Sequence, residues 1–293
     1  MVRPHLRGVA VYKMTGSGND FVVVDGRSSS PDEWAAADIQ AVCARGTGVG
    51  ADGLVFVGPG STAGAVRMTY LNSDGSRAMC GNAALCATRL AAHLGLANSL
   101  AMRLETDGAV YESRCARDDG RAEVRFASVA APAPVASSLL GDGERRAVLV
   151  TVGVPHLVVL VDDVEPVDVL GRGRPLRHEP ALGPEGANVN FVAPPGGPRG
   201  GGSEGRDGAR GTEWPMRTYE RGVEAETLAC GTGAMAVACA LDHWELARLP
   251  LTVRTRSGRA LDVRGQRGAT GGGGYEDMWL TGEARMVWRG VIT

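Results

Sequence analysis

Apolar and polar positions along the chain alternate between short strand-like runs and longer segments with helical spacing. Apolar runs rich in β-branched residues predict strands at residues 9–12, 21–25, 53–57 and 66–71. Helical spacing together with end signals predicts helices at residues 32–44, 81–94 and 232–246. This mixture of elements predicts an α/β fold.

An internal repeat links two segments that lie about half the chain apart. Tyr70 comes ten residues before Cys80, and Tyr219 comes eleven residues before Cys230. Each cysteine is followed by glycine and begins an alanine-rich helical segment, and residues 19–25 resemble residues 156–162. A repeat of this kind predicts two similar lobes, each with one cysteine at a helix start, and a boundary between residues 126 and 146.

Composition narrows the function classes. The chain has 293 residues, is 44% hydrophobic and carries a formal net charge of −2, which argues against nucleic acid or a lipid surface as the obligatory partner. No apolar run reaches the roughly 18–20 residues that span a bilayer. The N-terminal stretch lacks the pattern of a signal peptide, so we expect a cytoplasmic protein. The six cysteines include no CxxC pair, so we expect reduced thiols and no metal site.

Two observations argue against a cofactor. Lys13 is the only lysine, and no phosphate-binding sequence accompanies it, although pyridoxal phosphate requires a lysine for its Schiff base. Residues 48–53 match GxGxxG, but a helical segment precedes them and a strand follows, which is the reverse of a dinucleotide site. We therefore expect a tight turn there and no bound cofactor.

The repeated cysteines suggest a specific chemistry. Inverting an α-carbon requires a base on one face and an acid on the other, and a thiol on each lobe can supply both. Cys80 and Cys230 are predicted at helix N-termini, where the helix dipole favours the thiolate. The same helix ends can bind an α-carboxylate through backbone amides. The remaining cysteines are interpreted as packing residues: Cys43, Cys86, Cys115 and Cys239.

Seven motifs, in order along nearly the whole chain, closely resemble those of the diaminopimelate epimerase family. They are Lys13-Met14-x-Gly16-x-Gly18-Asn19-Asp20-Phe21, Asn72-x-Asp74-Gly75-Ser76, Met79-Cys80-Gly81-Asn82, Pro155-His156, Asn188-Val189-Asn190-Phe191, Tyr219-Glu220-Arg221-Gly222 and Glu226-Thr227-x-Ala229-Cys230-Gly231-Thr232-Gly233.

This resemblance implies a fold of two pseudo-symmetric α/β lobes. Each lobe would be a mixed β barrel around a central helix, with the active site in the cleft between the lobes. The first lobe would comprise residues 1–129 with a C-terminal strand in 277–293, and the second would comprise residues 130–276. The resemblance also implies a homodimer.

The activity implied is interconversion of LL- and meso-2,6-diaminopimelate in lysine and peptidoglycan precursor synthesis. Cys80 and Cys230 would be the acid and base, and His156 and Glu220 would assist proton transfer at Cys80 and Cys230 respectively. The substrate-binding residues implied by the same motifs are Asn19, Asn72, Gly81, Asn82, Asn188, Glu220, Arg221, Gly231 and Thr232.

Two departures from the family pattern leave alternatives open. Val154 stands where many relatives have asparagine, and Gly53 stands where some have glutamine, so two polar substrate contacts are absent or replaced. Alternative readings are a two-cysteine racemase of proline, hydroxyproline or histidine, a non-catalytic binding protein on the same frame, and a redox module with a Cys80–Cys230 disulfide. Arg221 and the asparagines favour a substrate with a second charged end.

Overall fold

The computed structural model describes residues 6–115, 119–196, 213–268 and 273–293. The chain divides into two compact units. Unit 1 extends to Arg125 and takes in Thr281–Thr293, and unit 2 is Phe126–Leu280. The chain passes from one unit to the other within two strands, β8 (Arg121–Val129) and β17 (Tyr275–Glu283).

Unit 1 is a mixed sheet. Besides part of β8, its strands are β1 (Ala10–Gly16), β2 (Asn19–Asp25), β3 (Gly53–Pro59), β4 (Ala65–Asn72), β5 (Arg77–Ala78), β6 (Met102–Glu105), β7 (Val110–Arg114) and β18 (Arg285–Val291). β2 pairs with β3 and β4 pairs with β6 in parallel, whereas the pairs β1–β2, β3–β4, β4–β5, β6–β7 and β7–β8 are antiparallel. β18 returns from the end of the chain and pairs antiparallel with β1.

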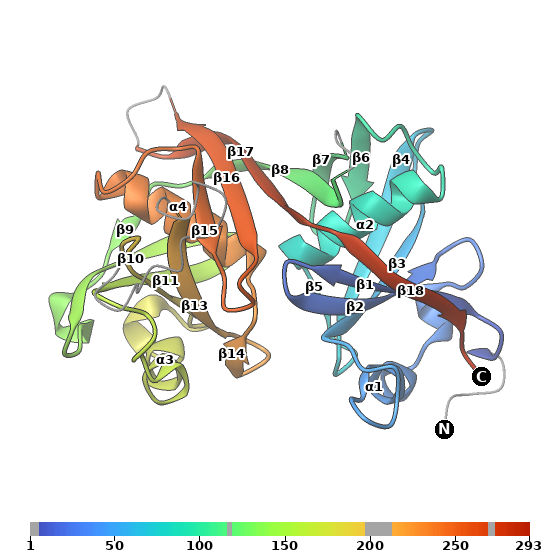
Figure 1. Ribbon diagram of the computed structural model, residues 1–293, viewed down its shortest axis with the longest axis horizontal. Helices are drawn as coiled ribbons and strands as arrows, with labels where there is room; N and C mark the ends of the chain where they lie inside the picture. Colours follow the sequence, from blue (N-terminus) through green and yellow to red (C-terminus); the bar gives the residue numbers. More distant parts are fainter. Residues whose placement is uncertain (1–5, 116–118, 197–212, 269–272) are drawn as a thin grey trace. The chain divides into compact units, whose positions relative to one another are not determined.

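Helix α2 (Gly81–His93) forms the centre of unit 1. It contacts six strands, β1, β2, β3, β4, β6 and β7, which surround it as a barrel surrounds its core (Figure 1). Alanine and other small residues dominate its sequence, and most of its side chains are buried. Small side chains allow strands to approach a helix from several directions, so an alanine-rich helix suits this central position.

Unit 2 repeats this arrangement. Its strands are β9 (Ala133–Pro134), β10 (Glu144–Val152), β11 (Val154–Val161), β12 (Asn188–Val192), β13 (Glu213–Glu220), β14 (Ala225–Thr227), β15 (Leu251–Arg254), β16 (Ala260–Arg267) and part of β17. β10, β11, β12, β13, β14, β15 and β16 pair as β1, β2, β3, β4, β5, β6 and β7 do, including the two parallel pairs β11–β12 and β13–β15.

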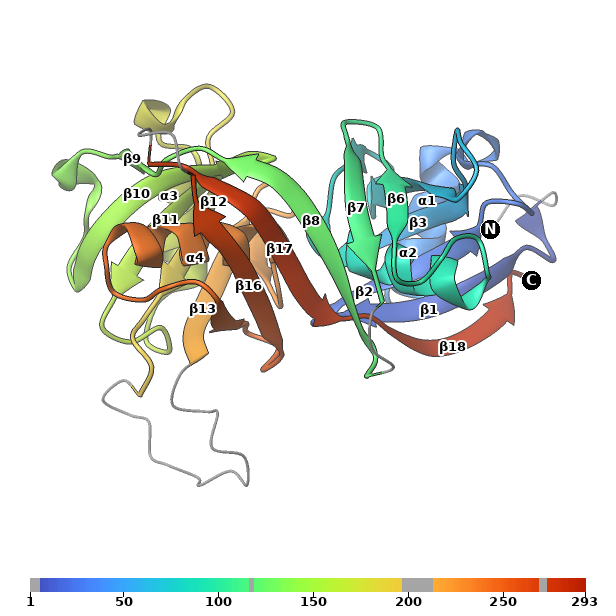
Figure 2. The same ribbon diagram turned by 90° about the horizontal axis from the view of Figure 1, so that it is seen from above.

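Helix α4 (Gly231–His243) is the central helix of unit 2, and all of it except His243 is buried. It contacts β10, β11, β12, β15 and β16 (Figure 2). The repeated pairing around a central helix confirms the predicted α/β fold of two similar lobes, each a mixed barrel around a helix.

Each barrel has a second hydrophobic core outside its sheet. In unit 1 this outer core packs against α1 (Ala36–Cys43) and includes Ile39, Phe56 and Leu71. In unit 2 the equivalent core packs against α3 (Val169–Arg177) and includes Phe191 and Tyr219. Alternate residues of β3, β4, β12 and β13 face these outer cores, so the residues between them face the central helices.

The first predicted helix begins later than expected. Ser30 and Glu33 form a capping box, but it caps a short 3-10 helix (Pro31–Glu33), and α1 starts only at Ala36. The buried Trp34 separates the two, and its indole N–H bonds to Ser29 Oγ. The prediction for residues 32–44 therefore assigned the capping signal to the wrong helix.

The third predicted helix ends earlier than expected, at His243. Glu245 adopts a left-handed conformation with φ 61°, and Leu246 N–H bonds to Leu241 O. The same bond, from Leu96 N–H to Ala91 O, closes α2. Helix α3 was not predicted, because it contains two glycines and Pro175. The other described 3-10 helices are Ser137–Leu139 and Pro180–Leu182.

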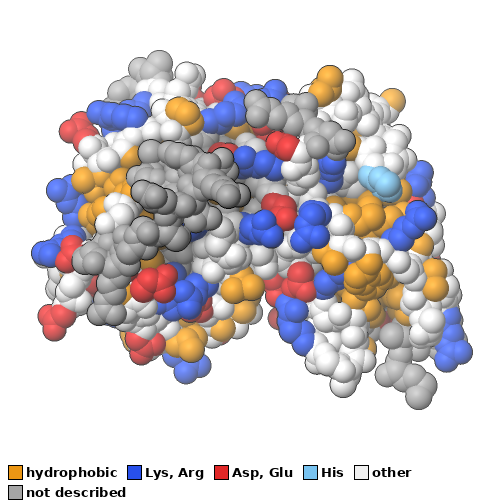
Figure 3. Space-filling view, viewed as in Figure 1, with side chains coloured by type: hydrophobic (Ala, Val, Ile, Leu, Met, Phe, Trp, Pro, Cys, Tyr) orange, Lys and Arg blue, Asp and Glu red, His pale blue; other side chains and the backbone are white. Residues whose placement is uncertain are grey.

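The described surface carries charges of both signs. Basic and acidic side chains are intermixed on the face of each unit in Figure 3, without a broad patch of one sign. Among the described residues, no helix combines the length and apolar character needed to cross a membrane.

Candidate active site

Cys80 occupies the N-cap of α2 in unit 1. Its backbone is extended, with φ −133° and ψ 121°, and its side chain is partly exposed. Gly81 and Asn82 follow in the first turn and are buried. The first amides of a helix have no intrahelical acceptor, so this end of α2 can donate hydrogen bonds to an anion.

A chain of polar contacts orients Asn82. Its Nδ2 donates to Asn19 Oδ1 at 2.6 Å, and Asn19 Nδ2 donates to Asp52 Oδ2 at 3.0 Å. Asp52 Oδ1 in turn accepts from Arg45 at 2.7 Å. Because a carboxylate can only accept, Asp52 fixes the orientation of both amides. Asn82 Oδ1 is left buried with no hydrogen-bond partner among the described residues, so it can accept from a ligand donor.

Asn72 lies at the end of β4, opposite Gly53 on β3. Its Nδ2 donates to Ser76 Oγ at 3.0 Å within the turn that follows the strand. Tyr70 is two residues earlier in β4 and therefore shares the face of Asn72, toward the central helix. The Tyr70 ring covers Gly53, where a Cβ would come within 2.5 Å of it.

The repeated tyrosines are not structurally equivalent. Tyr219 belongs to the outer core of unit 2, whereas Leu71, next to Tyr70, belongs to the outer core of unit 1. Tyr70 and Tyr219 therefore face opposite sides of their sheets. The strand registers show the cause: Tyr70 lies two residues before Asn72, the partner of Gly53, whereas Tyr219 lies one residue before Glu220, and side chains alternate along a strand.

Cys230 occupies the N-cap of α4 in the same extended conformation, with φ −142° and ψ 110°. Its Sγ accepts from Gly233 N–H at 3.4 Å and lies 3.7 Å from Thr232 Oγ1. Gly231 and Thr232 are buried in the first turn. Each unit thus presents one thiol at the start of its central helix.

Three of the expected site residues form a row across unit 2. His156 on β11 is the direct parallel partner of Asn188 on β12. Val189 pairs with Tyr219, and continuing this register by one residue places Glu220 opposite Asn188. Asn188 Oδ1 accepts from Arg221 N–H at 2.7 Å, and the Arg221 guanidinium pairs with Glu185 at 2.7 Å.

Behind this row lie two polar residues that the sequence interpretation did not select, Asn190 and Thr218. Asn190 Nδ2 is 3.2 Å from His156 Nδ1, and Thr218 Oγ1 donates to Asn190 Oδ1 at 3.0 Å. His156 is fully buried, and burial, aided by the positive charge of Arg221, lowers its pKa to about 3. Polar residues at every second position of Asn188-Val189-Asn190 were the available signal for a second residue on the same face.

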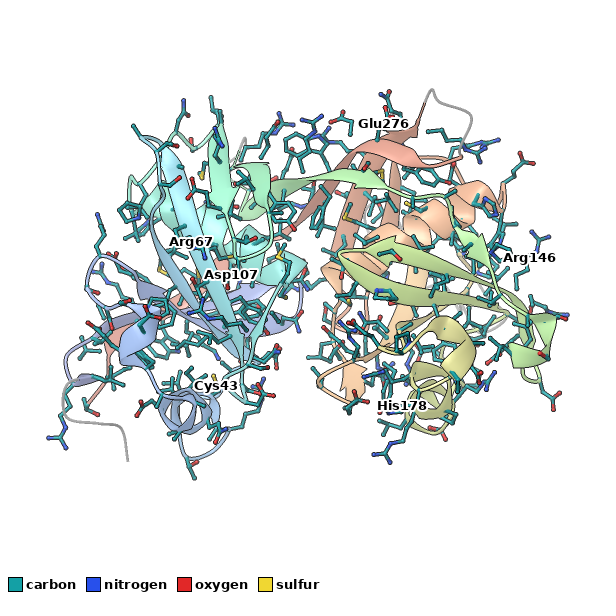
Figure 4. The ribbon with its side chains drawn as sticks, turned by 180° about the vertical axis from the view of Figure 1, so that it is seen from behind. Cys43, Arg67, Asp107, Arg146, His178 and Glu276 are labelled. Atoms are coloured by element: carbon teal, nitrogen blue, oxygen red, sulfur yellow. The ribbon has the colours of Figure 1, made fainter. Side chains whose placement is uncertain are left out.

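The other four cysteines lie in packed surroundings. Cys43 belongs to the outer core beside α1 (Figure 4), and burial raises the pKa of its thiol to about 12. Burial also raises the pKa of Cys86, Cys115 and Cys239. A thiol with a raised pKa is a poor base near neutral pH, so these cysteines serve packing. No disulfide joins any of the six cysteines, all of which lie in the described part of the chain.

Arg67 on β4 and Arg217 on β13 both have structural partners. Arg67 pairs with Asp107, and the two side chains lie together in Figure 4. Arg217 pairs with Glu226 at 2.7 Å and donates to the carbonyl oxygens of Val164, Glu165 and Val167.

Lys13 donates to Asp20 Oδ2 at 2.5 Å and to Gly50 O. Across the described ranges, no cluster of three or more histidine, cysteine or acidic residues could hold a metal ion.

Comparison with known sequences gives matches of nearly full length. A sequence model of the family described as diaminopimelate epimerase matches residues 11–130 and 148–274. A diaminopimelate epimerase of Gemmatimonas aurantiaca is 42% identical over 290 residues, covering 97% of this chain and 99% of that protein. One of Aquifex aeolicus is 36% identical over 295 residues, covering 96% and 97%.

Solved structures with low sequence identity share the fold. A predicted epimerase from Pseudomonas aeruginosa superposes with a TM-score of 0.69 at 18% identity, covering 97% of this chain and 99% of that one. A probable proline racemase from Agrobacterium radiobacter superposes with a TM-score of 0.67 at 14% identity, covering 97% and 93%. These likenesses extend over both units.

Proposed function

The chain belongs to the diaminopimelate epimerase family, and on this premise we propose that it is an isomerase that interconverts LL- and meso-2,6-diaminopimelate. The reaction serves lysine and peptidoglycan precursor biosynthesis and uses no cofactor. One observation carries the proposal: Cys80 and Cys230 are the N-cap residues of two central helices of the same length, in equivalent places of a repeated unit.

The two cysteines replace the proton of the α-carbon on one face by a proton on the other face. One cysteine, as thiolate, removes the α-proton from one face, and the other, as thiol, donates its proton to the opposite face. The substrate gains and loses one proton, no electrons are transferred, and the reverse reaction exchanges the two roles. His156 and Glu220 assist the transfer at Cys80 and Cys230 respectively.

Polar groups around the helix starts hold the substrate. Gly81 with Asn82, and Gly231 with Thr232, bind the reacting α-carboxylate, whose negative charge grows as the proton leaves. The remaining contacts are assigned to Asn19, Asn72, Asn188, Glu220 and Arg221. The buried acceptor Asn82 Oδ1 supports a ligand with a hydrogen-bond donor, such as an ammonium group.

Deuterium exchange distinguishes this function from proline racemisation. The protein is incubated in deuterated water with LL-diaminopimelate and, separately, with L-proline, and α-carbon labelling is followed by proton NMR. We expect labelling of diaminopimelate together with formation of the meso isomer. Labelling of proline alone would contradict the proposed substrate, and labelling of neither would support a non-catalytic binding protein.

We further propose a cytoplasmic homodimer. The cytoplasm keeps thiols reduced, which this chemistry requires. Val287, Trp288 and Val291 are large hydrophobic side chains exposed on β18, and they support an association through this strand. Sedimentation of the protein and of Val287→Glu tests the assembly: we expect a dimer that the substitution weakens, and a monomeric wild-type protein would contradict it.

A further inference from the structure

Three polar residues on adjacent strands of unit 2 form a buried line that starts at His156 in the proposed site. His156 on β11, Asn190 on β12 and Thr218 on β13 are each at most 1% exposed. Thr218 is the antiparallel partner of Asn190, and Asn190 follows Asn188, the parallel partner of His156, by two residues. All three side chains therefore share the face toward α4.

The orientation of the Asn190 amide is determined by its neighbours. Its Nδ2 lies 3.4 Å from Leu157 O as well as 3.2 Å from His156 Nδ1, and its Oδ1 accepts from Thr218 Oγ1. Turning the amide over would place its oxygen against the Leu157 carbonyl, where two acceptors would face each other. Gly233 limits the space on the other side, because a Cβ there would collide with Asn190 Oδ1.

The amide orientation determines the histidine tautomer. Because Asn190 Nδ2 can only donate, His156 Nδ1 must accept, and the ring proton is on Nε2. The ring is also neutral near pH 7, since burial lowers its pKa to about 3. In this state the ring already carries its single proton at Nε2 and cannot accept another there.

The Nε2–H group is itself an unsatisfied donor. It is buried and has no hydrogen-bond partner among the residues that the structure describes. A buried donor without an acceptor is unfavourable, so the buried Nε2–H group points to an acceptor supplied by a ligand. The positive charge of Arg221 acts on the same ring, which favours an anionic oxygen at this place.

We propose that Thr218 and Asn190 are positioning residues that hold His156 as the Nε2–H tautomer, and that His156 donates a hydrogen bond to a carboxylate oxygen of the substrate instead of accepting a proton. This inference rests on the proposed function and defines how His156 assists it. The hydrogen bond strengthens as the α-proton leaves, because negative charge accumulates on the carboxylate oxygens.

Nitrogen-15 NMR of the histidine rings tests the tautomer without substrate. The signals that the wild-type protein shows and His156→Gln lacks belong to His156. We expect these signals to place the ring proton on Nε2. Thr218→Val, which lacks the hydroxyl, should yield a mixture of tautomers, whereas Thr218→Ser should retain the wild-type signals. A ring proton on Nδ1 in the wild-type protein would overturn the proposal, and so would a Thr218→Val spectrum identical to wild type.

Substitutions of His156 itself test the donor role. The amide N–H of glutamine can replace Nε2–H but cannot act as a base, whereas alanine supplies neither. We expect His156→Gln to keep kcat within about tenfold of wild type and His156→Ala to lose about 10²–10³-fold, the usual effect of removing one such donor. Equal losses in both variants would show that the donor role is wrong.

The two kinds of failure are distinguishable. An active epimerase with the ring proton on Nδ1 contradicts this inference and leaves the proposed function intact. A protein with the Nε2–H tautomer that does not epimerise diaminopimelate contradicts the proposed function, and with it the substrate as the acceptor. Thermal unfolding of each variant shows whether a loss of activity reflects a loss of folding.

Discussion

The ring of Tyr70 lies against Gly53 on the neighbouring strand, in the space that a side chain at position 53 would occupy. A Cβ added to Gly53 would come within 2.5 Å of Tyr70 Cε2 and 2.9 Å of its hydroxyl. Tyr70 also makes an edge-to-face contact with Phe21, with ring centroids 5.9 Å apart. The residue at position 53 and the ring of Tyr70 therefore exclude each other sterically.

Gly53→Ala should destabilise the protein by about 1–3 kcal/mol, the usual cost of overpacking a core. The added methyl would overlap both the Tyr70 ring and Leu71 O. Tyr70→Leu should therefore relieve only part of the cost, and urea unfolding of the two single variants and the double variant measures their coupling. Strictly additive effects would show that the ring does not oppose a side chain at position 53.

Replacing either of the two cysteines at the starts of the central helices should stop epimerisation without unfolding the protein. Cys80→Ala and Cys230→Ala each remove the acid or base from one face, so we expect turnover to fall by at least about 10²–10⁴-fold. Cys86→Ala and Cys239→Ala are matched controls within the same two helices, where the thiols are fully buried. Normal turnover in either of the first two variants would contradict the two-base mechanism, and so would a comparable loss in the controls.

The sequence predicted the elements that local patterns determine, and it missed those that depend on contacts between residues far apart in the chain. The strands around residues 21–25 and 53–57 and the starts of both central helices follow from local patterns, and the structure has them there. The end of α4 was wrong because Glu245 adopts the left-handed conformation for which glycine is the usual signal. Local propensity also gave no sign of α3, whose packing against β12 and β13 compensates for its glycines and proline.

The polar contacts within each unit were harder to predict. The sequence identified Asn19 and Asn82 separately, but only the folded chain joins them through a 2.6 Å hydrogen bond. Asn190 and Thr218 appear in the sequence as ordinary strand residues, and their importance depends on the register of three strands. Tyr70 was matched with Tyr219 although the two face opposite sides of their sheets, a difference that strand register alone determines.

We expect Lys13, the only lysine of the chain, to stabilise the fold and to take no part in the chemistry. Its ammonium group is buried between Asp20 and Gly50 O, and Asp20 keeps a second partner in Arg45. Lys13→Met should therefore lower the free energy of unfolding by about 1–3 kcal/mol, within the range for a lost charged hydrogen bond. We expect kcat to stay within about twofold of wild type, since Asp20 keeps Arg45 as a partner and Asp52 still accepts from Asn19. A complete loss of turnover in a folded variant would indicate that the amine takes part in the chemistry.

The buried, neutral His156 should make the stability of the protein depend on pH below neutrality. Its pKa is lowered to about 3 in the folded protein, from an ordinary value of 6.5. The unfolded chain therefore binds a proton between these two values that the folded chain does not. The contribution of His156 to the free energy of unfolding is therefore fully present above pH 6.5 and is lost as the pH falls toward 3.

From pH 7 to pH 5 the contribution of this histidine should decrease by about 2 kcal/mol, because each pH unit between the two pKa values corresponds to about 1.4 kcal/mol. His156→Gln has no titrating group at this position and should lose correspondingly less stability over the same range. Urea unfolding of both proteins at the two pH values isolates the histidine from the carboxylates, which titrate equally in both. Parallel decreases in the two proteins would show that His156 is not held neutral by the fold.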